Sequence, residues 1–302
     1  MVYSIATSPE TKVQLAAHAD VPKFCREQVH RIVDDHQWKP LPGSRGASDL
    51  TPDPAFPTPP TISVNEVAAI YLDMAGHHLA ALSALYESHE VLMSVDMLTR
   101  AIVECCASAV CIQEGATPHE RLARAYLEED FSNEEQKKVA GRLTRPNSLY
   151  SMAAKDRFKR IRKEIAANFP GDYNLNDRVI HGQNRAGPTD AVSRFFALME
   201  SSGAVGFTGR KRKEGYYDLL SNGTHPTLYR MRDLRRYQEV GTDQIRRTTL
   251  IMDPGFLASL VQLAVLAIYN GPTSIYSYNG WSFDLGGEFE SKINQVLPGL
   301  LR

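Results

Sequence analysis

Residues 91–114 read VLMSVDMLTRAIVECCASAVCIQE, and this stretch decides the fold. Apolar side chains cover nearly the whole circumference of the helix that it would form: Leu92, Val95, Leu98, Ile102, Val103, Ala107, Val110 and Cys111. A helix with so little polar surface is typical of the centre of a bundle, because it needs apolar neighbours on every side. We therefore predict a helix over 91–114 with other helices packed around it.

The sequence that follows and precedes this stretch predicts those neighbours. Ser63 can cap a helix, and Glu66 three residues later completes a capping box. Apolar residues at helical spacing continue from there to Leu85. Further helices are predicted at 118–130, from 132 to about 143, and at 148–168, 188–201, 211–220, 256–269 and 288–297. The fold class is mainly α, an irregular multi-helix bundle.

Two polar segments are predicted to interrupt the helices. Residues 172–187 are rich in Asn, Asp and Gly and are predicted to form a loop. Residues 229–249 are rich in Arg with β-branched residues near their end, which fits either one short β-hairpin or an irregular segment.

The N-terminal part predicts a helical arm joined to the bundle by a strap. A helix is expected over 21–38, and seven of the 21 residues from Pro40 to Pro60 are proline. Proline has no amide hydrogen and a fixed φ, so neither a helix nor a central strand is expected in this strap. We predict an N-terminal helical arm over 1–38, a Pro-rich linker over 39–62 and a single helical domain over 63–302. The arm packs on the body or on a partner subunit, which would make a homodimer.

Composition is that of a globular protein. Hydrophobic residues make up 43% of the 302 and charged residues 23%, which excludes a collagen, a disordered chain and a disulfide-dense miniprotein. No run approaches the roughly 18 apolar residues of a membrane span. The first 20 residues lack a signal-peptide pattern, and four cysteines do not suggest a disulfide framework, so we expect a cytoplasmic protein. No nucleotide-binding or metal-ligand motif occurs, and no cofactor or metal is expected.

The net charge of −1 conceals an uneven distribution. Residues 137–247 hold 23 Lys and Arg against 11 Asp and Glu, whereas the rest of the chain holds 11 against 24. Such a split can make a basic face that attracts RNA or another phosphate ligand, or it can hold one half of the molecule, or a second copy, against the other. The residues expected to contact phosphate are Arg210, Lys211, Arg212, Lys213, Arg235 and Arg236.

A pair of opposite charges lies in the middle of the apolar helix predicted at 91–114. Arg100 and Glu104 are one turn apart and surrounded by apolar residues. Charges rarely lie in such a helix unless they are paired, because removing each ion from water costs several kcal/mol. The pair has two interpretations: a structural ion pair that fixes the register of the bundle, or a pocket wall whose Arg faces an anion.

A second polar motif occurs at residues 215–227, which read GYYDLLSNGTHPT. A helix continued to its end would place Tyr217, Ser221 and His225 along one face. Pro226 restricts His225 toward an extended backbone, and a histidine held beside hydroxyls can act as a general base or as a hydrogen-bond donor. Alternatively, His225 interacts with the dipole of its own helix.

Together, the Arg-x3-Glu and Tyr-x3-Ser-x3-His-Pro motifs resemble a group of uncharacterised bacterial helical proteins that is distantly HEPN-like. HEPN proteins are helical bundles that often act as ribonucleases or RNA binders in toxin and phage-defence systems. The resemblance spans 63–228 and rests on five residues: Arg100, Glu104, Tyr217, Ser221 and His225. HEPN nucleases share an Arg and a His with four to six residues between them. Only Arg31 and His36 have that spacing here, and they lie in the arm.

The resemblance implies a hydrolase or a binding protein that acts on RNA or another phosphate-bearing ligand. His225 would be the acid or base, Ser221 and Tyr217 would orient it, and Arg100, held by Glu104, would stabilise negative charge. Two alternatives remain open. The same residues form a structural polar network in a non-catalytic, dimeric interaction module, or the protein is a small-molecule enzyme with its site in the bundle core.

Overall fold

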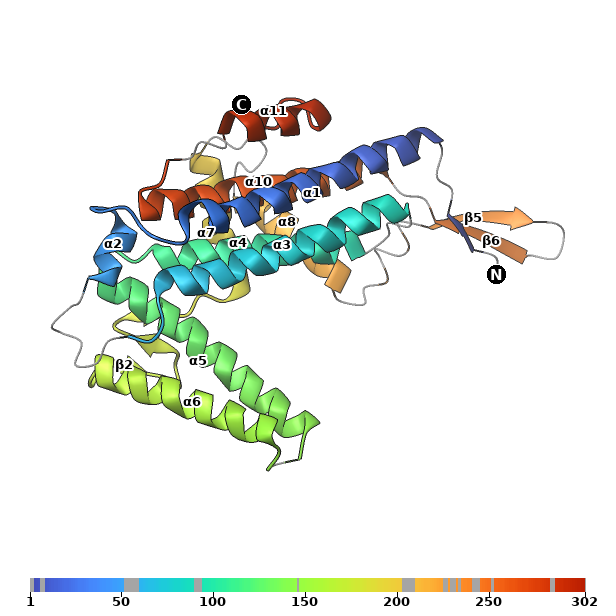
Figure 1. Ribbon diagram of the computed structural model, residues 1–302. Helices are drawn as coiled ribbons and strands as arrows, with labels where there is room; N and C mark the ends of the chain where they lie inside the picture. The colour runs from blue at the N-terminus through green and yellow to red at the C-terminus, as the bar shows by residue number, and fades with distance from the viewer. Residues whose placement is uncertain are drawn as a thin grey trace.

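The chain forms a helical bundle with two small sheets (Figure 1). This computed structural model describes residues 3–5, 9–51, 60–89, 94–145, 147–202, 210–224, 228, 232, 235–240, 245–250, 253–282 and 286–301. The predicted fold class, a mainly α multi-helix bundle with a short hairpin, is confirmed. Elements carry the labels of Figure 1.

Helix α4 (Ser94–Gln113) lies in the middle of the bundle, as its sequence predicts. Its most extensive contacts are with α3 (Val64–Ser88), α7 (Pro188–Ser201), α8 (Arg210–Thr224) and α10 (Pro254–Asn279). Ile102, Val103 and Cys106 are fully buried among them. The predicted cap of α3 is also present, because the Ser63 hydroxyl accepts the amide of Glu66 at 3.0 Å.

The first helix, α1 (Pro9–His36), packs along α3 and α10. Its buried residues, among them Leu15 and Cys25, belong to the same apolar cluster as those of α4 and α10. The described part of the chain therefore shows this helix on the body of its own subunit. It begins at Pro9 rather than at residue 21, and Pro22 lies inside it. Packing of the flanking turns offsets the backbone hydrogen bond that Pro22 cannot make.

The prediction that no helix forms in the proline-rich strap is wrong for one segment. Helix α2 (Arg45–Leu50) lies between Pro42 and Pro52, and its six residues contain no proline. The Ser44 hydroxyl caps it by accepting the amide of Ala47 at 3.1 Å. A short helix with a capping residue can therefore form in the segment between two prolines that itself contains none.

Helices α5 (Pro118–Leu143) and α6 (Leu149–Asn168) form a hairpin that projects from the bundle (Figure 1). It has an apolar cluster of its own that includes Tyr126, Ile161 and Ile165. Two helices were predicted where α5 is one. The Asn133 side-chain nitrogen donates to the Glu129 carbonyl at 2.7 Å and to Glu129 Oε2 at 2.8 Å, so it bonds back to the preceding turn and the helix continues through it.

Short strands occupy both polar segments. β2 (Tyr173–Asn174), β3 (Val179–Ile180) and β4 (Gln183–Asn184) form an antiparallel sheet where a loop was predicted. Left-handed backbone at Arg178, His181 and Gly182 makes its tight turns. β5 (Arg235–Val240) and β6 (Ile245–Leu250) form an antiparallel hairpin, the first of the two alternatives for 229–249, and β1 (Tyr3–Ile5) pairs with β6 in parallel.

Helix α10 continues to Asn279, past the predicted end at 269, and short helix α11 (Gly286–Val296) follows it. Among the described residues, α10 alone is long and apolar enough to cross a membrane. Most of its apolar window is buried inside the bundle, which is the usual position of a core helix. The cytoplasmic location remains a prediction.

Candidate functional site

The structure brings the first polar motif against part of the second, where α4 contacts α8. Arg100 Nε donates to Glu104 Oε1 at 2.7 Å, and its Nη2 donates to the Tyr217 hydroxyl at 3.0 Å. The same hydroxyl donates to Glu104 Oε1 at 2.8 Å. The Arg100 guanidinium also lies over the Tyr217 ring, 5.1 Å from its centre. The three side chains thus form a closed triangle between two helices.

The triangle lies in the wall of the bundle. Tyr217 is buried, whereas the side chains of Arg100 and Glu104 keep 19% and 28% of their exposure. The pair therefore joins two neighbouring helices and still reaches solvent. This position agrees with both interpretations of the pair, because it fixes the register of α8 on α4 and lines the outer surface of that contact.

The ionisation of the triangle follows from its partners. Burial raises the pKa of the Tyr217 phenol, and the hydrogen bond and charge of Glu104 raise it further. Burial alone would lower the pKa of Arg100, but the bond to Glu104 outweighs it and the pKa is raised. The phenol is therefore protonated at neutral pH and acts as a donor, not as a base. The site therefore contains two hydrogen-bond donors in fixed positions, the Tyr217 hydroxyl and the Arg100 guanidinium, and the positive charge of Arg100 is paired with Glu104.

The other predicted site residues are placed to different degrees. Ser221 lies one turn after Tyr217 on α8, and its hydroxyl donates to the Tyr217 carbonyl at 2.8 Å. His225 follows the last residue of α8 and lies outside the described residues. The predicted phosphate contacts fall on two elements: Arg210, Lys211, Arg212 and Lys213 begin α8, and Arg235 and Arg236 begin β5.

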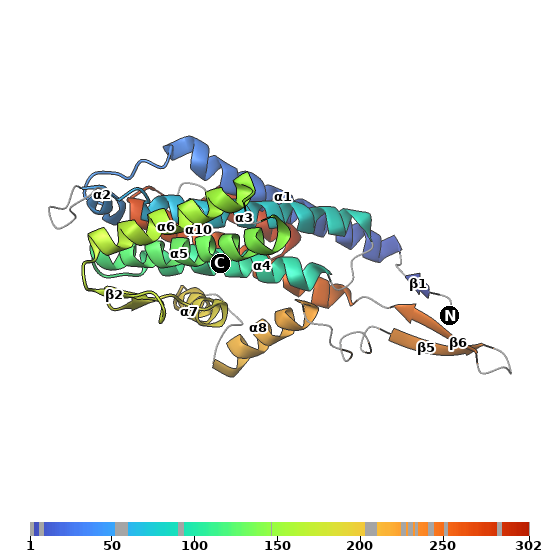
Figure 2. The same ribbon diagram turned by 90° about the horizontal axis from the view of Figure 1, so that it is seen from below.

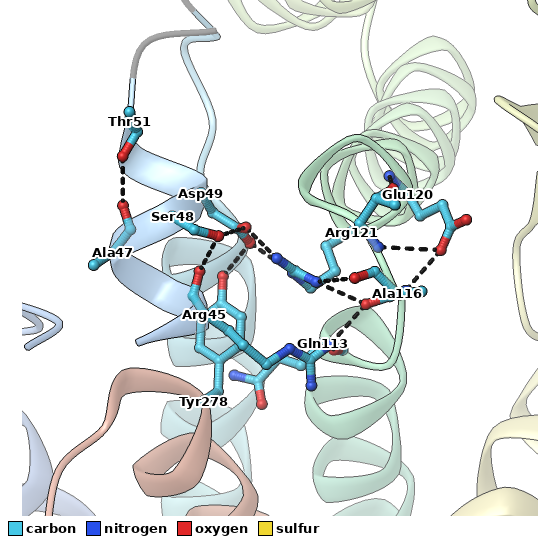
Figure 3. Close-up of polar contacts among 12 residues, drawn as sticks. Arg45, Ala47, Ser48, Asp49, Thr51, Gln113, Ala116, Glu120, Arg121 and Tyr278 are labelled. Carbon is cyan, nitrogen blue, oxygen red and sulfur yellow. Dashed lines mark hydrogen bonds and ion pairs between the residues drawn. The ribbon is translucent and has the colours of Figure 1, made fainter. Parts of the chain in front are cut away.

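A second polar network, missed by the sequence analysis, centres on Arg121 at the start of α5 (Figure 3). Its guanidinium is only 2% exposed and contacts Asp49 of α2 through two atoms, Nε to Oδ2 at 2.9 Å and Nη2 to Oδ1 at 2.5 Å. Nη1 donates to the carbonyls of Gly115 at 2.8 Å and Ala116 at 3.1 Å. The Tyr278 hydroxyl donates to the same carboxylate.

Arg45 completes this network from the other end of α2. Its Nη2 donates to the carbonyls of Gln113 at 2.8 Å and Gly115 at 2.6 Å. These carbonyls lie at the end of α4, where backbone acceptors lack helical partners and a cation is favourable. Arg45, Asp49 and Arg121 therefore fasten α2 to the end of α4 and the start of α5. We call this set of three residues with Tyr278 the strap latch.

A smaller network joins α3, α5 and the segment after β4. The Tyr71 hydroxyl donates to Glu128 Oε2 at 2.8 Å, and Arg185 Nε donates to the same oxygen at 3.1 Å. The Arg185 guanidinium also lies 3.6 Å from the centre of the Phe131 ring. Burial, followed by the charge of Glu128, raises the pKa of Tyr71, so this phenol is a donor as well.

The cysteines have the properties of core residues. All four are free and buried, and burial raises the pKa of Cys105 and of Cys111 to about 12. Thiols of this kind are poor nucleophiles at neutral pH. Within the described ranges, His, Cys, Asp and Glu do not gather in any group of three that could hold a metal ion.

Comparisons with protein-family models, with curated protein sequences and with solved structures found no match. They give the HEPN-like resemblance no independent support. The function is therefore inferred from the residues at the α4–α8 contact and from the charge around them.

Proposed function

We propose that this chain is a HEPN-like protein that binds RNA or another phosphate-bearing ligand beside the α4–α8 contact, in a toxin or defence role. One observation carries the proposal. The helix that supplies Tyr217 to the triangle begins with four consecutive cationic residues, 210–213. A helix rises 1.5 Å per residue, so this segment lies about 6–10 Å from Tyr217 along the axis.

The charge of the triangle supports binding of an anion rather than of a cation. Glu104 already accepts hydrogen bonds from Arg100 and from Tyr217, so its negative charge is compensated inside the site. Residues 210–213 add four positive charges to the first turn of α8, which favour an anionic ligand over a cationic one. Arginine and lysine in this density are typical of surfaces that contact phosphates.

Cleavage is a separate part of the proposal and depends on His225. This residue is the next in the sequence after α8, four residues after Ser221, and imidazole is the usual general base near neutral pH. If the protein is a hydrolase, His225→Ala abolishes cleavage of a labelled RNA and leaves its binding intact. Equal cleavage by the variant would exclude His225 as the catalytic group.

Binding is tested by fluorescence anisotropy with a labelled single-stranded RNA at 50–200 mM salt. We expect affinity to fall steeply with salt, because each phosphate contact releases counterions. Lys211→Glu with Arg212→Glu should lower the slope of log K against log salt by about 1.4, for two lost contacts on a single strand. The matched control reverses the charges of Lys12 and Lys23 by substitution with Glu. These two residues are exposed on α1, which lies away from α8 (Figure 2).

Salt-independent binding, or an equal loss in the control, would rule out phosphate recognition at α8. The second candidate function, a non-catalytic interaction module, would then be preferred. It is favoured by the closed geometry of Arg100, Glu104 and Tyr217, in which each side chain bonds to the other two. For that function, Tyr217→Phe lowers thermal stability and no RNA binding is detected for any variant.

A further inference from the structure

The tip of the α5–α6 hairpin exposes an unusual amount of apolar side chain. Leu143, at the end of α5, is 79% exposed, and Leu149, at the start of α6, is 87% exposed. Val139, Tyr150 and Met152 beside them are also exposed. Isolated exposed apolar residues are ordinary, but five within 14 residues at one projecting end indicate a surface that binds something. We call these five residues the tip.

The tip is strongly basic at its margins. Residues 136–163 contain ten Lys and Arg and a single acidic residue, Asp156. Several of the cations are exposed: Arg142, Arg145, Lys155, Arg157 and Lys159. The occupant of this surface should therefore present apolar side chains together with negative charge.

A surface of that kind exists on the same chain, on the outward side of α3. Ile70 and Met74 are exposed there, one turn apart, and the exposed Ala81 and Ala84 lie farther along the same face, beyond the exposed His77. Helix α3 contains three carboxylates and no Lys or Arg over all of Val64–Ser88. The carboxylates are exposed: Glu66, Asp73 and Glu87. We call this surface the α3 stripe.

The two surfaces do not cover each other within one subunit. Each remains exposed, and the hairpin diverges from α3 toward its tip (Figure 1). Both surfaces can be covered at once if two copies exchange contacts, so that each tip lies on the α3 stripe of the other copy. A two-fold axis makes these contacts identical, and the assembly closes at two subunits.

We propose that the partner of the tip is a second copy of this chain, bound through its α3 stripe. The opposite charges and matching apolar residues of the two surfaces carry this assignment. It differs from a dimer through the N-terminal arm and does not depend on RNA binding.

Sedimentation velocity of the full chain at 1–100 μM tests the proposal. The tip variant carries Leu143→Asp with Leu149→Asp, and the stripe variant carries Ile70→Lys with Met74→Lys. Each should be monomeric, with a dissociation constant raised at least 100-fold. All four positions are exposed, so folding should persist, and circular dichroism with a thermal melt verifies it.

Mixing the two variants gives the decisive result. In the mixed dimer, the intact tip of one variant meets the intact stripe of the other, and at the second contact Asp meets Lys. The equimolar mixture should therefore form dimers although neither variant does alone. A dimer through two tips predicts the opposite, because the stripe variant would still dimerise. The controls Val13→Asp and Leu50→Lys place the same kinds of charge at other exposed apolar positions and should leave the dissociation constant of the dimer unchanged.

Three outcomes overturn the proposal. The first is a monomeric wild-type chain at 100 μM, and the second is a mixture that fails to dimerise. The third is a monomer that sediments with vesicles of 30% phosphatidylglycerol in phosphatidylcholine, or that binds single-stranded RNA, and loses this binding in the tip variant. That result would identify a membrane or RNA as the occupant instead.

Discussion

The strap latch makes the sharpest stability prediction, because it encloses a charge that water does not reach. In Asp49→Ala the guanidinium of Arg121, 2% exposed, loses its paired carboxylate and keeps the carbonyls of Gly115 and Ala116 and the adjacent Tyr278 ring. Removing one member of a buried ion pair costs about 3–5 kcal/mol. Counting the two lost bonds to a charged group at about 1.5–3 kcal/mol each gives a similar range. We expect a loss of about 4 kcal/mol.

Urea unfolding followed by circular dichroism at 222 nm measures this loss, and a thermal scan should show a midpoint lower by about 6 °C. The control is the double variant Asp49→Ala with Arg121→Met, which removes the buried charge together with its partner. It should recover most of the stability, because a buried pair replaced by apolar groups is often close to neutral. A loss below about 1 kcal/mol in Asp49→Ala, or no recovery in the double variant, would refute the reasoning.

Three further predictions concern other parts of the molecule. In Gly46→Ala the new Cβ would clash with the Asn279 amide oxygen, so α2 must shift, and we expect a lower unfolding midpoint. The control Gly141→Ala, on α5, adds a carbon that meets no atom within 4 Å and should not lower the midpoint. Cys105 and Cys111, with a pKa of about 12 against an ordinary 9.0, should react with a thiol reagent at pH 8 about 1000-fold more slowly than a free thiol, and equal rates in the native and urea-unfolded chain would contradict this. Because the pKa of Tyr217 is raised in the folded state, its protonated phenol contributes fully to stability below about pH 10, the pKa of an unfolded tyrosine. This contribution is lost as the pH rises through the pKa of the folded state. An ultraviolet difference titration of the wild type against Tyr217→Phe should therefore show that Tyr217 ionises above pH 10.

Local signals in the sequence were sufficient for much of the fold. The apolar circumference of 91–114 identified the central helix, and the cap at Ser63 identified the start of α3 within a residue. These features depend on contacts within one helical turn, such as the hydrogen bond from the Glu66 amide to the Ser63 hydroxyl. The pairing of Arg100 with Glu104 was predictable for the same reason, because residues four apart share a helix face.

The missed features depend on partners far apart in the chain. Asp49 and Arg121 are 72 residues apart, and the bond from Tyr278 to Asp49 spans 229. Nothing near residue 49 distinguishes its carboxylate from an exposed one in a proline-rich segment. The one local signal was the spacing of Arg45 and Asp49, one turn apart between prolines, which permits a single helical turn. The length of α10 was missed because Pro272 suggests an end that burial of the flanking turns overrides.

A comparison of Arg121 with Arg100 shows why the α4–α8 contact, and not the strap latch, is the better candidate for function. Arg121 is saturated by a carboxylate and two carbonyls and is closed to solvent, so an incoming anion would have to displace Asp49 and open the fold. Arg100 is 19% exposed and bonds to side chains on two helices, one of which begins with four cations. An anion bound there gains the charge of α8 without breaking the core. Arg121→Met should therefore alter stability and leave RNA affinity per folded molecule unchanged, whereas charge reversal on α8 should alter affinity and leave stability unchanged.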